Sequence, residues 1–158
     1  MSWIRNVEKI CMFTWLYGPA GAGKSAIAQT IADMCHSANL LAATFFFSHM
    51  AMDRNSEQAL VSTIIYQLIL FIPEVRSRAV DALEQDPLLL TKAIDTQLHE
   101  LLVIPLNEAA EKPDETFDSR PRFIILDGLD ECSDVRTQLR VLKALERAVE
   151  QLSTPLFS

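Results

Sequence analysis

The sequence predicts a single α/β domain with a mostly parallel sheet. Three apolar runs have the length and composition of buried strands, namely Cys11–Tyr17, Leu40–Ser48 and Phe123–Asp127. Helical stretches separate these runs, and strands that alternate with helices are typical of a parallel sheet. A length of 158 residues, 49% of them hydrophobic, suits one domain with one core.

The helices after the first two strands are identified from the spacing of their apolar residues. One is predicted over Lys24–Ser37, where apolar residues recur among alanines. Another is expected to be capped by Asn55, with Gln58 three residues on, and to be stopped by Pro73. The spaced apolar residues are Ile27, Ile31 and Met34 in the first helix, and Leu60, Val61, Ile64, Ile65 and Leu68 on the inner face of the second.

Two more helices and a loop are predicted before the third strand. The first helix spans about Glu74–Gln85 and ends at the Asp-Pro pair that follows it. The second spans about Thr91–Val103 and ends at Pro105. Residues 107–121 contain two prolines and many charges, so we expect them to form an exposed loop.

The third strand turns abruptly acidic at its end. In "RFIILDGLDEC", Asp130 and Glu131 follow Asp127 within four residues. A final helix comes next, and either Ser133 or Asp134 can cap it. The apolar residues of its predicted inner face are Val135, Leu139, Leu142, Leu145 and Val149.

Charge and cysteine content narrow the classes of partner. A net charge of −7 and a pI near 4.9 leave no basic stripe, so neither nucleic acid nor an anionic membrane is an expected partner. The cysteines, Cys11, Cys35 and Cys132, are odd in number and widely spaced. This pattern favours reduced thiols and a cytoplasmic location.

Glycine is concentrated in one place. The chain has four glycines, and three of them lie between Gly18 and Ser25, which indicates a backbone that needs positive φ or close approach to another group. The segment matches G-x-x-x-x-G-K-[ST] between an apolar strand and a helix, the context of a phosphate-binding loop. Its residues are Gly18, Pro19, Ala20, Gly21, Ala22, Gly23, Lys24 and Ser25. The plainer alternative is a glycine-rich turn that joins strand to helix.

The residue types of this loop suit a bound nucleotide. Backbone N–H groups of such a turn can surround phosphate oxygens, and the start of the helix adds its partial positive charge. Lys24 would reach the terminal phosphates, and the Ser25 hydroxyl would bind Mg²⁺. Mg²⁺ also needs a carboxylate, which Asp127 offers at the carboxyl end of a strand. The alternative for the acidic residues is a solvated turn before a helix cap.

The stretches "WLYGPAGAGKSAIAQTIAD", "LLAATFFFS" and "ILDGLDEC" resemble NACHT domains of the STAND class of P-loop NTPases. They are most similar to the nephrocystin-type module frequent in fungal proteins. The resemblance implies a three-layer α/β/α P-loop fold and a signalling switch that binds ATP or ADP with Mg²⁺. It makes Lys24 and Ser25 the ligands supplied by the phosphate loop, Asp127 the acid that supports Mg²⁺, and either Asp130 or Glu131 the residue that positions or deprotonates the attacking water.

The chain also departs from the family pattern. Members usually carry an effector segment before the NTPase domain and a sensor region after it. Here residues 1–10 form only a short lead-in, and "STPLFS" ends the chain where the family would enter another strand. We therefore expect residues 1–158 to be a partial domain with about three core strands of the implied order 5-1-4-3-2. His49 stands where similar sequences often have arginine, and Arg54 is the nearest cation.

Two enzymatic functions compete with the binding switch. An active ATPase would turn over steadily, whereas the family implies slow hydrolysis, so this chain is expected to be at most a slow ATPase. A P-loop kinase needs an arginine-rich lid, but Arg136, Arg140 and Arg147 are spaced as a solvated face of the final helix. The expected partners are the nucleotide and, through self-association, other copies of the chain.

Overall fold

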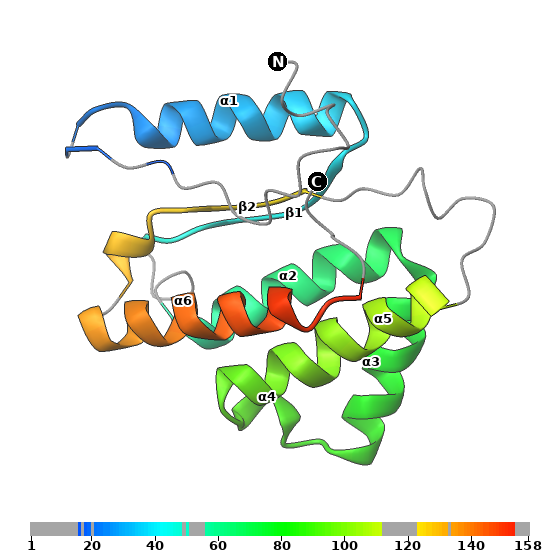
Figure 1. Cartoon of the computed structure of the whole chain (residues 1–158). Helices are drawn as coiled ribbons and strands as arrows, with labels where there is room; N and C mark the ends of the chain where they lie inside the picture. The colour runs from blue at the N-terminus through cyan, green and yellow to red at the C-terminus, as the bar shows by residue number, and fades with distance from the viewer. Residues whose placement is uncertain are drawn as a thin grey trace.

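The computed structural model describes residues 16, 18–19, 21–48, 50, 56–111, 123–132 and 134–153. Within them the fold is mixed α/β and mostly helical (Figure 1). In chain order the elements are α1 (Lys24–Ser37), β1 (Leu41–Phe46), α2 (Glu57–Phe71), α3 (Pro73–Gln85), a 3₁₀ turn (Leu89–Thr91), α4 (Ile94–Leu98), a π-helical segment (His99–Val103), α5 (Ile104–Glu111), β2 (Phe123–Asp127), a second 3₁₀ turn (Leu129–Glu131) and α6 (Val135–Glu150). None of the described helices is both long enough and apolar enough to cross a membrane.

The sheet consists of β1 and β2, which pair in parallel. At one end Phe123 donates its N–H to the carbonyl of Leu40 at 2.9 Å, and at the other Phe47 donates to the carbonyl of Asp127 at 2.8 Å. The second and third predicted strands are therefore confirmed as neighbours, and so is the α/β class. The first predicted strand, Cys11–Tyr17, lies outside the described residues except for Leu16.

Helices lie on both sides of the sheet. Helix α1 contacts both strands from one side, and α2 packs against β1 from the other. Helix α6 lies on the same side as α2, and α3, α4 and α5 form a further layer beyond them (Figure 1). Most of the buried apolar core comes from this second side, where the helices pack against one another.

Helix α1 has the predicted bounds and packs through small residues. It buries Ala32 and Cys35, whereas Ile27 and Met34 are 45% and 42% exposed. Burial raises the pKa of the Cys35 thiol. Cys35 and Cys132 are both buried and neither forms a disulfide, as expected of reduced thiols, and Cys11 lies outside the described residues.

Helix α2 has the predicted inner face but a different cap. Leu60, Val61, Ile64, Ile65 and Leu68 are all buried. The cap is Ser56, whose Oγ accepts a hydrogen bond from the Ala59 N–H at 3.2 Å. The prediction that Asn55 is the cap is wrong by one residue, and Asn55 itself lies outside the described residues. Pro73 ends α2 as predicted, because it is already the first residue of α3.

Pro105 does not end a helix, contrary to the prediction. The predicted helix over Thr91–Val103 is instead a 3₁₀ turn, the short α4 and the π-helical segment, and α5 runs through Pro105 to Glu111. A proline inside an α-helix clashes with the carbonyl four residues earlier. The wider π turn that precedes Pro105 relieves this clash and lets the helical path continue.

The predicted loop over residues 107–121 begins as a helix. Residues 107–111 belong to α5, and residues 112–121 lie outside the described part of the chain. Asn107 donates to the carbonyl of Gln151 at 2.9 Å and accepts from the N–H of Ser153 at 2.7 Å. These two bonds hold α5 to the end of α6. The prediction of a loop is therefore wrong for residues 107–111, because this tertiary contact stabilises them as helix.

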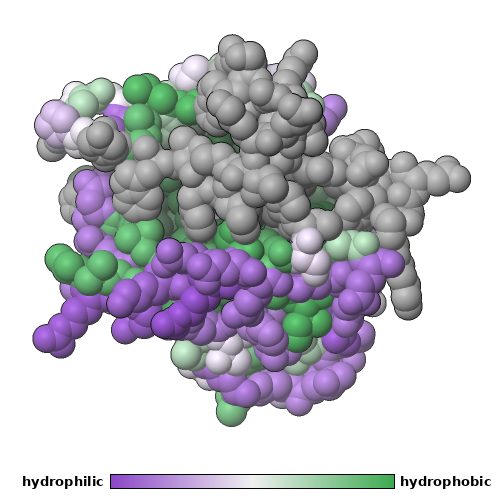
Figure 2. Space-filling model, in the orientation of Figure 1, coloured by the Kyte–Doolittle hydropathy of each residue, from purple (hydrophilic) through white to green (hydrophobic). Residues whose placement is uncertain are grey.

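Helix α6 is capped by one of the two predicted alternatives, and its predicted inner face is confirmed only in its second half, where Leu145 and Val149 are buried. Asp134 accepts from the N–H groups of Arg136 and Thr137 at 2.8 and 3.0 Å, and Ser133, the other candidate, lies outside the described residues. Val135 and Leu139 are 66% and 51% exposed. The buried residues are Thr137, Val141, Ala144, Leu145, Ala148 and Val149. Small residues here let α6 approach α4 and the π-helical segment closely, and its outer face is hydrophilic along most of its length (Figure 2).

Two leucines of α2 allow a matched test of the core. Leu68 is fully buried and Leu70 is 62% exposed. We expect Leu68→Ala to lower the free energy of unfolding by about 2–5 kcal/mol, because it leaves a cavity. Leu70→Ala is expected to change it by less than about 0.5 kcal/mol. Urea unfolding followed by circular dichroism measures both, and equal effects would contradict the packing described for α2.

Candidate functional site

The glycine-rich turn before α1 has the backbone that its glycines predict. Gly21 and Gly23 have φ of +78° and +79°, in the left-handed region that favours glycine. The N–H of Ala22 donates to the carbonyl of Pro19 at 3.2 Å, which closes a tight turn. Ala20 lies outside the described residues. The turn is thus built from conformations that other residues adopt only with strain.

Helix α1 begins at Lys24 without a side-chain cap. Gly23 occupies the cap position, and the first turn contains no acidic residue. The first helical hydrogen bond runs from the N–H of Ile27 to the carbonyl of Gly23 at 3.0 Å. The N–H groups at a helix start need partners from outside the helix. An anion can supply them, and the helix dipole favours it.

The Lys24 ammonium lies over the turn that precedes it. Its Nζ donates to the carbonyl oxygens of Gly18 at 3.0 Å and Pro19 at 3.2 Å. The Ser25 side chain, next along the helix, is exposed. The described residues of the predicted phosphate loop therefore place one cation and one hydroxyl at the start of α1.

The acidic turn after β2 depends on Gly128. Its φ is +72°, and a Cβ at this position would lie 2.8 Å from the carbonyl oxygen of Phe47, which follows β1. Only glycine lets the turn approach the end of the neighbouring strand so closely. Gly128 thereby determines the path of the backbone directly after Asp127.

The three predicted carboxylates lie on or next to this turn. Asp127 ends β2 and is half-buried, Asp130 is exposed, and Glu131 is half-buried. A hydrogen bond of 2.7 Å from the N–H of Glu131 to the carbonyl of Gly128 closes the 3₁₀ turn. Gln138 of α6 donates to the carbonyl oxygens of Asp130 and Cys132, both at 3.3 Å. The backbone of the turn is therefore held to α6.

The glycine-rich turn before α1 and the acidic turn after β2 lie at the same edge of the sheet. Both strands end at the edge of the sheet where α1 begins (Figure 1), because α1 runs back along the sheet before the chain enters β1. No ion pair joins Lys24 to Asp127 in the described part of the chain. The described residues also contain no group of three or more His, Cys, Asp or Glu side chains that could hold a metal ion.

The arginines of α6 connect helices. Arg140 pairs with Glu57 of α2 at 2.7 Å, and Arg147 pairs with Asp95 of α4 at 2.8 Å. The hydrogen bond that Arg140 donates to the Glu57 carboxylate raises the pKa of Arg140. All three predicted arginines are exposed, as expected of a solvated face, while His49 and Arg54 lie outside the described residues.

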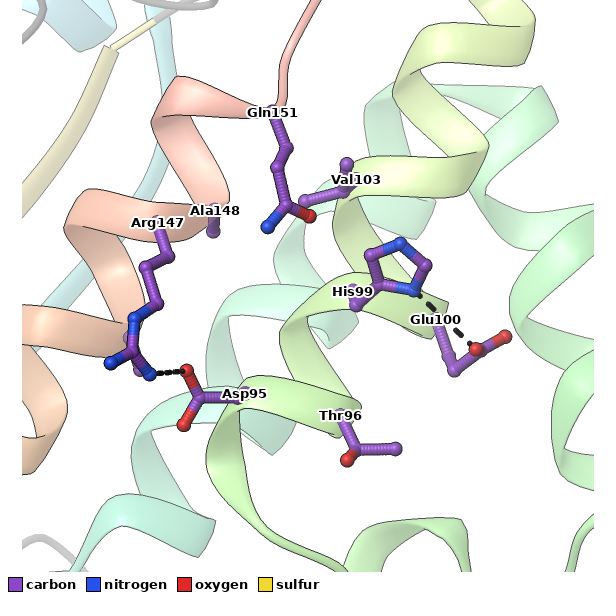
Figure 3. A pocket seen from close by; sticks show the side chains of 9 residues that line it. Asp95, Thr96, His99, Glu100, Val103, Arg147, Ala148 and Gln151 are labelled. Carbon is purple, nitrogen blue, oxygen red and sulfur yellow. Dashed lines mark hydrogen bonds and ion pairs between the residues drawn. The ribbon is translucent and has the colours of Figure 1, made fainter.

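A hollow of about 400 Å³ lies between α4, the π-helical segment and α6 (Figure 3). It is lined by Asp95, Thr96, His99, Glu100, Val103, Ala144, Arg147, Ala148 and Gln151. The Arg147–Asp95 ion pair closes one side, and His99 contacts Glu100 at 3.4 Å. No sequence pattern indicates this hollow, because it depends on how two helices far apart in the chain pack. It contains none of the predicted phosphate-loop residues.

The described fold defines a mixed α/β protein with a parallel sheet. The family model "Nephrocystin 3, N-terminal" matches residues 1–157, so the chain belongs to that family. Comparisons with curated proteins and with solved structures found no match. The nephrocystin part of the resemblance noted in the sequence is thereby confirmed.

The glycines allow a graded test of this geometry. Gly18→Ala should change the free energy of unfolding by less than about 0.5 kcal/mol, because the new Cβ would have only an ordinary contact, 3.7 Å from the Cβ of Ala22. Gly21→Ala meets no atom but has positive φ, so we expect a loss of about 1–2 kcal/mol. Gly128→Ala combines positive φ with the clash against Phe47 and should cost the most. Denaturant unfolding of the three variants gives the order, and a Gly128→Ala variant as stable as Gly18→Ala would contradict the turn.

Proposed function

We propose that this chain is the nucleotide-binding module of a NACHT-type P-loop NTPase switch, which binds ATP or ADP with Mg²⁺. The observation that carries the proposal is the turn from Gly18 to Lys24. Left-handed glycines lead into a helix without a cap, and the only lysine of the segment lies over the turn. The family match over residues 1–157 agrees with it.

The N–H groups and the Lys24 ammonium at the start of α1 could all donate hydrogen bonds to phosphate. The N–H groups of the turn and of the first helical turn would donate to phosphate oxygens. Lys24 would exchange its two carbonyl acceptors for the more favourable charged acceptors of the terminal phosphates. These groups are all donors, and an anion is the ligand class that they suit.

The residues around the loop also fit a magnesium ion. Ser25 has an exposed hydroxyl, and Asp127 ends the strand at the same edge of the sheet. Mg²⁺ prefers oxygen ligands of this kind and is usually shared with the phosphates. When bound it would neutralise phosphate charge. Asp130 and Glu131 stand one turn further out, where either could orient or deprotonate a water molecule.

A binding switch fits the described residues better than rapid turnover or phosphate transfer to a small substrate. Both of these reactions benefit from an arginine that stabilises transition-state charge. Arg140 and Arg147 of α6 are instead engaged with carboxylates of α2 and α4. Slow hydrolysis would keep the nucleotide bound long enough to select between two conformations.

The first test concerns Lys24. We expect Lys24→Ala to weaken binding of a fluorescent ATP analogue by about 10-fold or more, because a charge-assisted bond to phosphate is lost. Lys143→Ala on the exposed side of α6 is the matched control and should bind like the wild type. Fluorescence titration measures both dissociation constants. If Lys24→Ala binds the ATP analogue as tightly as the wild type, the assignment of this segment as a phosphate-binding loop is wrong.

The second test concerns the metal. Removal of Mg²⁺ with EDTA should weaken nucleotide binding by the wild type, and Asp127→Asn should abolish most of this dependence. Asp130→Asn and Glu131→Gln should leave binding intact, and the variant that slows single-turnover hydrolysis identifies the base. If Asp127→Asn keeps the full Mg²⁺ dependence, the metal site is placed wrongly.

A further inference from the structure

The side chain of Gln67 imitates a neighbouring strand. From α2, its Oε1 accepts the N–H of Thr44 at 3.0 Å, and its Nε2 donates to the carbonyl of the same residue at 2.7 Å. A side-chain amide has the same donor and acceptor as a peptide unit. Both backbone groups of one strand residue are thus bound by a single side chain, in the middle of β1.

Thr44 faces the edge of β1 that is turned away from β2. The N–H of Phe47 points to β2, where it bonds the carbonyl of Asp127. Backbone groups of successive strand residues alternate between the two edges. Those of Thr44, three residues before Phe47, therefore point outward, which agrees with their bonds to Gln67.

Gln67 is a polar residue in a helix that is mostly apolar. Between Glu57 and Glu74 the helix and its end contain no charged residue, and most of the residues are apolar. Its two bonds to Thr44 place Gln67 on the side of α2 that faces β1. Its Nε2 also approaches the carbonyl of Thr63, one helical turn earlier, at 3.3 Å, which orients the amide toward the strand.

We propose that Gln67 is an edge cap that closes β1 to pairing with a further strand. An uncapped strand edge is a template for another extended chain, including β1 of a second copy. With Thr44 bound to Gln67, such a chain must first break two hydrogen bonds. Leu41–Phe46 is then the terminal strand, and a larger sheet can grow only from the outer edge of β2. The proposal does not rest on nucleotide binding.

Hydrogen exchange of the wild-type chain tests the cap in solution. The Thr44 amide should exchange at least about 10-fold more slowly than that of Phe46, the next residue whose backbone faces the same edge. Nuclear magnetic resonance resolves the two amides. If Thr44 exchanges as fast as Phe46, the cap does not persist and the proposal is overturned.

Substitution of Gln67 tests its consequence. Gln67→Met keeps the shape of the side chain but makes neither bond, so the Thr44 amide should lose its protection. The variant should also dimerise at a protein concentration at least about 10-fold below that of the wild type in sedimentation velocity. Gln29→Met, on the exposed face of α1, is the control and should behave as the wild type. A Gln67→Met chain that folds but associates no more than the control overturns the proposal.

A third variant distinguishes the loss of the edge cap from the loss of a polar side chain at position 67. Gln67→Glu keeps an acceptor for the N–H of Thr44 but places a negative charge beside its carbonyl. Charged side chains at a strand edge oppose pairing. We therefore expect Gln67→Glu to associate no more than the wild type, even where Gln67→Met dimerises. Dimerisation of Gln67→Glu to the same extent would contradict an edge-specific mechanism. If Gln67→Met fails to fold, the exchange comparison of Thr44 with Phe46 still decides the proposal.

Discussion

The parallel pairing of β1 with β2 is the contact on which the rest of the structure depends. It joins segments that are distant in sequence and ends both strands at one edge. Helices α1 and α2 pack on opposite sides of the strand pair, so the position of each helix depends on the sheet. The same pairing brings the carbonyl of Phe47 against Gly128, and this contact shapes the turn that carries the acidic residues.

Features encoded by local sequence could be predicted from the sequence. The bounds of α1, the buried stripe of α2 and the strands around Leu41–Phe46 and Phe123–Asp127 follow from apolar spacing over a few residues. Glycine scarcity was equally informative. Three of the four glycines have positive φ, and two of these, Gly21 and Gly23, lie in the predicted loop.

Features decided by tertiary contacts could not be predicted in this way. Pro105 continues a helix because a π turn precedes it, and Asn107 is ordered by the end of α6. The buried side of α6 includes the predicted Leu145 and Val149 but takes in Val141, Ala144 and Ala148 in place of Val135 and Leu139, since a close helix neighbour decides which stripe is covered. For the same reason the acidic residues could be identified, but not the contact with Phe47 that holds their turn.

The connection between the two strands has a consequence for the order of folding. Helices α2 to α5 lie between β1 and β2 in the chain, so the strands must close a long loop before they gain any hydrogen bonds. Contacts among these helices involve much shorter separations, as between α2 and α3 or α4 and the π-helical segment. Local contacts form fastest. We therefore expect the helical layer to assemble early and the pairing of β1 with β2, which positions Asp127, to form late.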